Sequence, residues 1–128
     1  MSLVLGPSTP PLDRTTIGSL IEERASRIGD RQAVVVPWQS TRLTFKDLAD
    51  RSKLTAKALL RSGLKHGDCV GVMAGNCYQY VEIFLGAARI GCPCVVFNNT
   101  YSPHELKDAV ARSGMCEQKP SITSSSSY

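Results

Sequence analysis

ARIGCPCVVFNNTYSPHEL, residues 88–106, is the stretch that decides the fold class of this chain. It begins with the end of a helical pattern that stops at Gly91, and a short run of strand-forming residues follows at 94–97. A polar turn comes next. The sequence SPHE at 102–105 then gives a capping serine, a first-turn proline and a glutamate that can return the capping bond. The stretch therefore predicts a strand between two helices, with a polar turn at its carboxyl end.

The same order of elements occurs immediately upstream. Residues 69–73, CVGVM, have the composition of a buried strand, and Asn76 followed by Gln79 predicts a capped helix start. Strand, helix, strand and helix over residues 69–114, with short connections, predict a partial doubly wound parallel sheet with flanking helices, in the α/β class. The residues expected on the inner faces of the two helices are Val81, Phe84, Leu85, Ala88, Leu106, Ala109 and Val110.

The part of the chain before these elements predicts a helix and a hairpin. Apolar residues recur on one helical face between residues 17 and 28, and Gly29 ends that pattern. Residues 33–36 and 42–44 are short strand candidates, and the loop between them, 37–40, is expected to be loose.

A longer helix is predicted from residue 45 to the glycine at position 63. Thr44 and Asp47 have the spacing of a capping box at its start. Its charged face could meet an anionic partner, but a solvated helix face is the favoured interpretation. The residues expected to be buried are Phe45, Leu48, Ala49, Ser52, Ala56, Leu59 and Leu60, and the charged row is Lys46, Asp50, Lys53, Lys57 and Arg61.

Length and composition predict one globular unit. The chain has 128 residues, of which 42% are hydrophobic and 20% charged, and its net charge is +4. Basic and acidic residues are interspersed, which argues against a nucleic-acid module. No run approaches the ~20 apolar residues of a membrane span, and the first residues do not form a signal peptide. Five cysteines without a secretory signal indicate an intracellular protein with reduced thiols.

Three segments are expected along the chain. Residues 1–15 are proline-rich and predict an extended lead-in. Residues 16–114 contain all the predicted helices and strands. Residues 115–128 end in a serine-rich tail that is expected to be disordered.

The cysteines raise the possibility of a metal or redox site. Cys92-Pro93-Cys94 lies in a sequence that also contains Cys69, Cys77 and His66. Zinc sites usually combine two matching CxxC-type pairs, which this spacing does not provide. Cys69 and Cys94 also fall within strand patterns, so both are predicted to be buried apolar residues, and no metal ligands are assigned.

No catalytic constellation is found in the sequence. Residues 71–76 join a strand to a helix start, where a phosphate could bind, but they match neither common phosphate-loop motif. A glycine-assisted turn accounts for them equally well. His66 and His104 have no nucleophile or acid at a meaningful spacing. Ligands of open α/β sheets bind beyond the carboxyl ends of the strands, and that is where Asn98-Asn99-Thr100-Tyr101 follows its strand.

The order of these motifs resembles the amino-terminal region of the adenylate-forming acyl-CoA synthetases and ligases. The resemblance covers about residues 16–114, and the wording FNNTYSPHEL is most similar to fungal acyl-CoA ligases, including those of secondary metabolism. The residues that carry it are Leu43-Thr44-Phe45, Gly67-Asp68, Asn76, Arg89-Ile90-Gly91 and the segment from Asn98 to Pro103.

The resemblance implies a fold and a reaction. The fold would be the N-terminal part of the adenylate-forming enzyme fold. Family members join a fatty or secondary-metabolite carboxylic acid to ATP, with Mg²⁺, and then transfer the acyl group to coenzyme A. Asn98, Asn99 and Tyr101 would lie on the substrate-side crevice. A full-length member could be cytoplasmic or peroxisomal.

The family's phosphate loop, nucleotide contacts and catalytic lysine do not map onto any residue here. No catalytic or cofactor-binding residue is therefore assigned, and the acid is not specified by the sequence. Residues 115–128, MCEQKPSITSSSSY, depart from the family pattern, as a truncated gene product, an altered reading frame or a fragment would. The chain alone is expected to be inactive. The alternative function is that of a non-catalytic binding or assembly partner, or decoy, with self-association through an exposed sheet edge.

Overall fold

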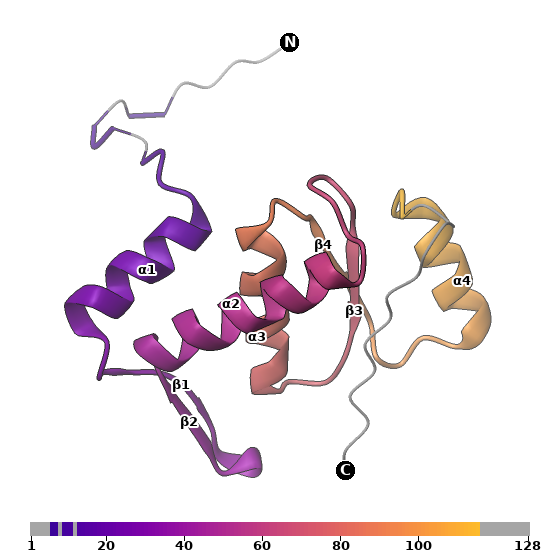
Figure 1. The fold of residues 1–128 in the computed structure, drawn as a ribbon. Coiled ribbons are helices and arrows are strands. Elements are labelled where there is room, and N and C mark those ends of the chain that lie inside the picture. The colour runs from indigo at the N-terminus through magenta and orange to yellow at the C-terminus, as the bar shows by residue number, and fades with distance from the viewer. Residues whose placement is uncertain (1–5, 8, 12, 116–128) are drawn as a thin grey trace.

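The computed structural model describes residues 6–7, 9–11 and 13–115, and Figure 1 shows its arrangement of helices around two small sheets. The serine-rich tail predicted at 115–128 lies outside the described residues except for its first position. None of the described residues before Thr16 belongs to a helix or strand. The elements are α1 (Ile17–Ile28), β1 (Gln32–Val36), the 3-10 helix η1 (Pro37–Gln39), β2 (Thr41–Thr44), α2 (Phe45–Arg61), β3 (Val70–Met73), α3 (Tyr78–Arg89), β4 (Cys94–Phe97) and α4 (Pro103–Arg112).

The predicted hairpin is confirmed. β1 and β2 pair in the antiparallel sense, with a register irregularity between Gln32 and Val34. The loop is more ordered than the sequence predicts, because it forms the single 3-10 turn η1. Ser40 closes this turn in the left-handed region, with φ of 48°, and its N–H donates to Pro37 O at 3.0 Å.

The predicted parallel pairing is also confirmed. β3 and β4 lie side by side in the same direction, with Val70 opposite Cys94 and Met73 opposite Phe97. Helix α3 connects them, so the segment forms a strand–helix–strand unit. Among the described residues, β4 has no second neighbouring strand.

Capping boxes begin two of the helices as predicted. The Thr44 hydroxyl accepts the Asp47 N–H at 3.1 Å, and the Asp47 carboxylate accepts the Thr44 N–H at 2.9 Å. Ser102 and Glu105 make the same reciprocal pair at the start of α4. In both helices, the bonds from the capping residue's backbone lower the pKa of the acid.

The core forms two clusters of buried side chains. Val70 and Val72 of β3 pack with Ala87 and Cys92 in the first. Leu43, Leu48 and Leu85 form the second, between β2, α2 and α3. Both clusters include a residue of α3, which therefore connects the hairpin side of the molecule to the parallel sheet.

Helices α2 and α3 pack closely because small residues face each other. Ala49, Ser52 and Ala56 are buried on α2. Opposite them, Gly86 leaves so little space that an added Cβ would lie 2.7 Å from Thr55 Cγ2 and 3.2 Å from Ala56 N. Larger residues at this contact would force the helices apart.

A polar network joins α1 to this helix pair. The Arg89 Nε donates to the buried Ser52 hydroxyl at 2.8 Å, and Arg89 also forms an ion pair with Glu22 at 2.6 Å. Glu22 forms a second ion pair with Lys53 at 2.9 Å. The bond from Lys53 is the main cause that lowers the pKa of Glu22, and Arg89 adds to it.

Two predictions about buried positions are wrong. Leu60 is 51% exposed, and Phe84 is also exposed. Adjacent helical residues point about 100° apart. Leu59 and Leu85 take the inward directions, so their neighbours Leu60 and Phe84 turn outward.

Changing Gly86→Ala should lower the free energy of unfolding by about 1–3 kcal/mol, because the new methyl group meets the branched Thr55 side chain. The matched control is Gly18→Ala in α1, where the added Cβ would have its nearest contact at 3.4 Å, to Arg89 Cγ. That change should be neutral or stabilising by about 0.5–1 kcal/mol. Urea unfolding would measure both. Equal stabilisation by the two changes would contradict close packing at Gly86.

Candidate functional site

The candidate site consists of two loops at the carboxyl ends of β3 and β4, residues 74–77 and 98–102, which we call the strand-end loops. The parallel register brings Met73 and Phe97 opposite each other, so both loops leave the same edge of the sheet. The loops also approach each other directly, because a Cβ built on Gly75 would lie 3.8 Å from Asn99 Nδ2. This is the place where open α/β sheets bind their ligands.

The second strand-end loop is a compact turn. The Asn98 Oδ1 accepts hydrogen bonds from the Thr100 N–H at 3.0 Å and from its hydroxyl at 2.9 Å. The Tyr101 N–H donates to Asn98 O at 3.2 Å. Asn98, Asn99 and Tyr101 are all exposed, so the structure places these three predicted residues together on one accessible turn. The side-chain oxygen of Asn98 is engaged within its own turn.

The first strand-end loop differs from the prediction at its helix start. Helix α3 begins at Tyr78, and its N-cap is Cys77, which makes no side-chain capping bond. Asn76 is therefore not the cap, and Gln79 does not return a bond to it. Both residues instead contact the hairpin loop: Asn76 O accepts from Trp38 Nε1 at 3.0 Å, and Gln79 Oε1 accepts from Gln39 Nε2 at 3.1 Å.

Gln39 is the residue that the sequence analysis missed. Its Oε1 accepts the Tyr78 N–H at 3.0 Å, which satisfies the first N–H of the helix, one of the four without an intrahelical partner. No local pattern connects positions 39 and 78. The only sequence signal was indirect, because cysteine is not a preferred N-cap residue.

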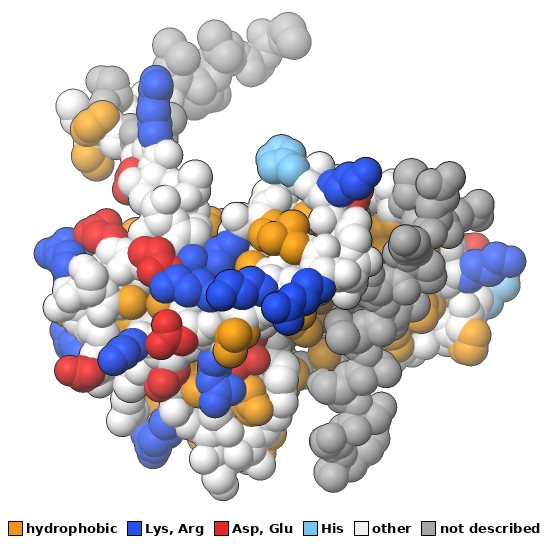
Figure 2. Space-filling model, viewed as in Figure 1, with side chains coloured by type: hydrophobic (Ala, Val, Ile, Leu, Met, Phe, Trp, Pro, Cys, Tyr) orange, Lys and Arg blue, Asp and Glu red, His pale blue; other side chains and the backbone are white. Residues whose placement is uncertain are grey.

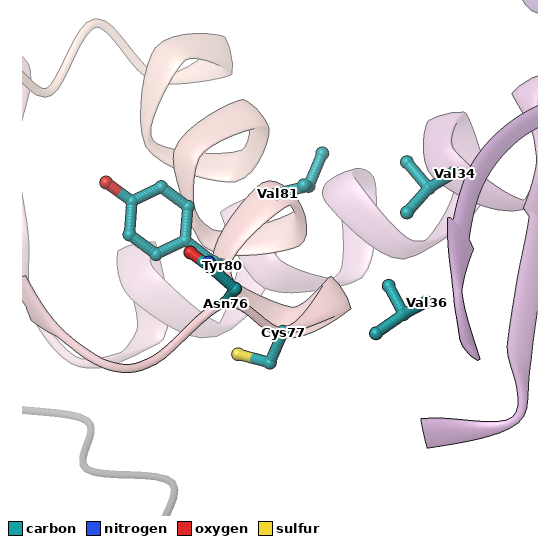
Figure 3. Close-up of a pocket in the computed structure, with 6 residues that line it drawn as sticks. All are labelled: Val34, Val36, Asn76, Cys77, Tyr80 and Val81. Carbon is teal, nitrogen blue, oxygen red and sulfur yellow. The ribbon is translucent and has the colours of Figure 1, made fainter. Parts of the chain in front are cut away.

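A small cavity lies between the hairpin and the start of α3. Its volume is about 230 Å³. Figure 3 shows Val34 and Val36 projecting from β1 toward Cys77 and Val81, while the Tyr80 ring points away from the hairpin. The lining is mainly apolar, and Asn76 contributes to it at the rim of the first strand-end loop.

The cysteines do not form a metal site in the described residues, where no group of three or more metal-binding side chains occurs. Cys92 is buried, at 4% exposure, and its Sγ donates to Lys65 O at 3.2 Å. The prediction that Cys69 and Cys94 are buried strand residues is only partly correct, because both are half-buried and Cys69 precedes β3. Burial raises the pKa of the Cys92 and Cys94 thiols. Burial and a raised pKa both favour a packing role for these thiols over metal ligation or nucleophilic attack.

The charged surface agrees with the solvated interpretation. All five residues of the charged row on α2 are exposed, and Figure 2 shows Lys and Arg side chains intermingled with Asp and Glu on the face that it presents. His104 lies 3.5 Å from Asp108 on exposed α4. None of the helices in the described part of the chain combines the length and apolar character that crossing a membrane requires.

The geometry described above defines a class of protein: an α/β unit with paired loops at the ends of parallel strands. The sequence profile of the AMP-binding enzymes matches residues 21–116, and the chain belongs to this family. Its fold is that of part of the N-terminal domain of adenylate-forming acyl-CoA synthetases, because the match covers 26% of one such isolated domain. Over 78% of the chain it resembles a Mycobacterium tuberculosis fatty acyl CoA synthetase, with a TM-score of 0.75 and 27% identity, and this region covers 20% of that enzyme.

Fungal relatives are more similar in sequence. The chain is 47% identical to the acyl-CoA ligase cnsG of Penicillium expansum over 113 residues, which are 88% of this chain and 24% of that protein. It is 46% identical to the acyl-CoA ligase sidI of Beauveria bassiana over 82% of its own length and 18% of the relative. The chain thus spans a quarter or less of these relatives, and the predicted resemblance to fungal acyl-CoA ligases is confirmed.

The turn at Asn98 can be tested with two substitutions. Asn98→Ala removes both hydrogen bonds to Thr100, so amide exchange at Thr100 should accelerate about 2- to 10-fold, as for the loss of one net hydrogen bond. Asn98→Asp keeps the acceptor and should leave the exchange rate near that of the parent. NMR-detected hydrogen exchange provides the measurement. If Asn98→Ala leaves Thr100 unchanged, the side chain does not hold the turn.

Proposed function

We propose that this chain acts as the N-terminal α/β part of an ATP-dependent acyl-CoA ligase, with residues 16–114 as the folded subdomain. In the full reaction, an acid and ATP give an acyl-adenylate and pyrophosphate, and the acyl group then passes to coenzyme A with release of AMP. ATP, Mg²⁺ and coenzyme A are the expected cofactors of the complete enzyme. The observation that carries the proposal is the close approach of the two strand-end loops in a chain of the AMP-binding family.

The contribution of the strand-end loops is to shape the substrate-side crevice. Asn99 and Tyr101 are exposed on the turn, and an amide and a phenol can donate hydrogen bonds to a substrate and accept them from it. Asn98 maintains the turn through its bonds to Thr100. We therefore assign these residues to substrate positioning and assign no bond-making role to any of them.

The substrate class is proposed from the relatives. Several of them are named as acyl-CoA ligases of fungi, and others as medium-chain acyl-CoA ligases. A fatty acid or a secondary-metabolite acid is the expected substrate of the complete enzyme, in the cytoplasm or in peroxisomes.

A chimera tests the proposed function. Residues 16–114 of this chain would replace the matching segment of the Penicillium expansum ligase, which is 47% identical. The chimera should form acyl-CoA at a rate within about tenfold of the parent, equivalent to about 1.4 kcal/mol in the barrier. Acyl-CoA formation would be followed with an acid that the parent is first shown to accept.

Two controls accompany the chimera. The same chimera with Gly86→Leu should lose activity together with folding, since the larger side chain separates α2 from α3. The 128-residue chain alone should give no acid-dependent pyrophosphate release from ATP. A chimera that is folded but inactive, or turnover by the chain alone, would overturn the proposal.

A second function, non-catalytic assembly, is favoured by the outer edge of β4. The strand sequence Cys-Val-Val-Phe contains no charge or proline, and Val96 is 57% exposed. Native proteins usually protect such edges with charge, proline or a cover. We propose that two copies of this chain associate through this edge, and that the chain can bind as a partner rather than as a catalyst.

Association should increase with protein concentration in size-exclusion chromatography with light scattering. Val96→Lys should shift the protein toward the monomer, because a charge on an edge strand opposes pairing. The matched control is Val35→Lys, which adds the same charge at an exposed valine of β1. A monomer at every concentration, or equal effects of the two substitutions, would exclude association through β4.

A further inference from the structure

We infer that Gln39 and Trp38, at the tip of the β1–β2 hairpin, are positioning residues that set the conformation of the first strand-end loop. Through this loop they would also control its contact with Asn99. The inference depends on the proposed function in one respect only: the assignment of the strand-end loops to the substrate-side crevice.

Gln39 binds the first turn of α3, where the N-cap residue Cys77 makes no side-chain hydrogen bond. Its amide oxygen accepts the Tyr78 N–H at 3.0 Å, and its amide nitrogen donates to Gln79 Oε1 at 3.1 Å. One side chain thus binds the first two residues of the helix. The first four N–H groups of a helix have no intrahelical partner and therefore need one from elsewhere.

Trp38 binds the backbone of the loop itself. Its indole N–H donates to Asn76 O at 3.0 Å, although the residue is 68% exposed. Burial therefore accounts for little of this contact, and the directional hydrogen bond accounts for its position. Trp38 is the only tryptophan of the chain.

Polar contacts hold the hairpin tip to α3, in addition to the apolar packing between β1 and this helix. Val34, Tyr78 and Val81 pack against the cluster of Leu43, Leu48 and Leu85. The 230 Å³ cavity lies beside them, between Val36 and the start of the helix. The hairpin tip is itself preorganised. The Thr41 hydroxyl donates to Gln39 O at 2.9 Å, and Ser40 holds its left-handed conformation beside it.

The first strand-end loop is short, so a shift of the hairpin contacts should displace the whole loop. Between the end of β3 at Met73 and the start of α3 at Tyr78 there is little chain to absorb a displacement. Gly75 lies within this loop and faces the Asn99 amide. Movement of the Asn76 carbonyl or of the helix start therefore changes the surface that Gly75 and Asn99 share.

The test uses the ¹⁵N-labelled 128-residue chain and two substitutions at position 39. Gln39→Met preserves length but removes the acceptor, so exchange of the Tyr78 amide should accelerate about 2- to 10-fold. The side-chain amide signal of Asn99 should shift as well. Gln39→Glu restores an acceptor, so protection should return at neutral pH.

The glutamate variant gives a readout that a general structural effect would not. The Tyr78 amide shift should acquire a pH dependence, with an apparent pKa below about 4.3 because the carboxylate lies at a helix N-terminus. Below that pKa, the protonated group accepts more weakly and protection should fall. Trp38→Phe, which keeps a ring but removes the donor, should also shift the Asn99 signal.

The matched control is Gln32→Met, which changes an amide on the same hairpin. Gln32 binds Arg42 and not α3, so Tyr78 and Asn99 should not respond. Should Gln39→Met fail to fold, as judged by exchange at Val72, the titration in Gln39→Glu decides alone. The inference is overturned if the Tyr78 amide shift in Gln39→Glu does not depend on pH, or if the Asn99 signal does not respond to substitutions at position 39. Both measurements are independent of ligase activity, so their failure is distinct from failure of the chimera.

Discussion

Close packing between α2 and α3 is the constraint on which the remaining structure depends. Gly86 on α3 meets Thr55 and Ala56 on α2 at distances that leave no space for a methyl group. Helix α3 is also the connection between the two parallel strands. The separation of the helices therefore sets how Val70 and Val72 are covered on one side and how Leu85 meets the hairpin on the other.

The polar groups at this contact extend the same constraint to α1. Ser52 is fully buried, donates to Ala49 O at 3.0 Å and accepts from Arg89. Arg89 then reaches Glu22 on α1. A buried hydroxyl without partners would be destabilising, so the serine and the arginine depend on each other. Within the Arg89-Ile90-Gly91 motif of the family resemblance, Arg89 thus connects α3 to α2 and α1 in this chain.

Sequence reasoning succeeded where the determining interactions are local. The pairs Thr44–Asp47 and Ser102–Glu105 are three residues apart, and both capping boxes form as predicted. The strand-end turn at Asn98 is local in the same way. The predicted cap at Asn76 is wrong: α3 begins at Tyr78, whose N–H is bound by Gln39 through a contact that only the tertiary fold creates. No spacing rule relates residues so far apart.

The core and the candidate site are stabilised by different kinds of contact. The core clusters and the α2–α3 contact are buried, and they open only with a large part of the structure. The first strand-end loop is held from the hairpin by individual hydrogen bonds, each with a net contribution of about 0.5–1.5 kcal/mol. Such contacts can break and form again while the core remains intact. The fold therefore provides a rigid base and an adjustable edge, and the adjustable edge is the one at which Gly75 and Asn99 meet.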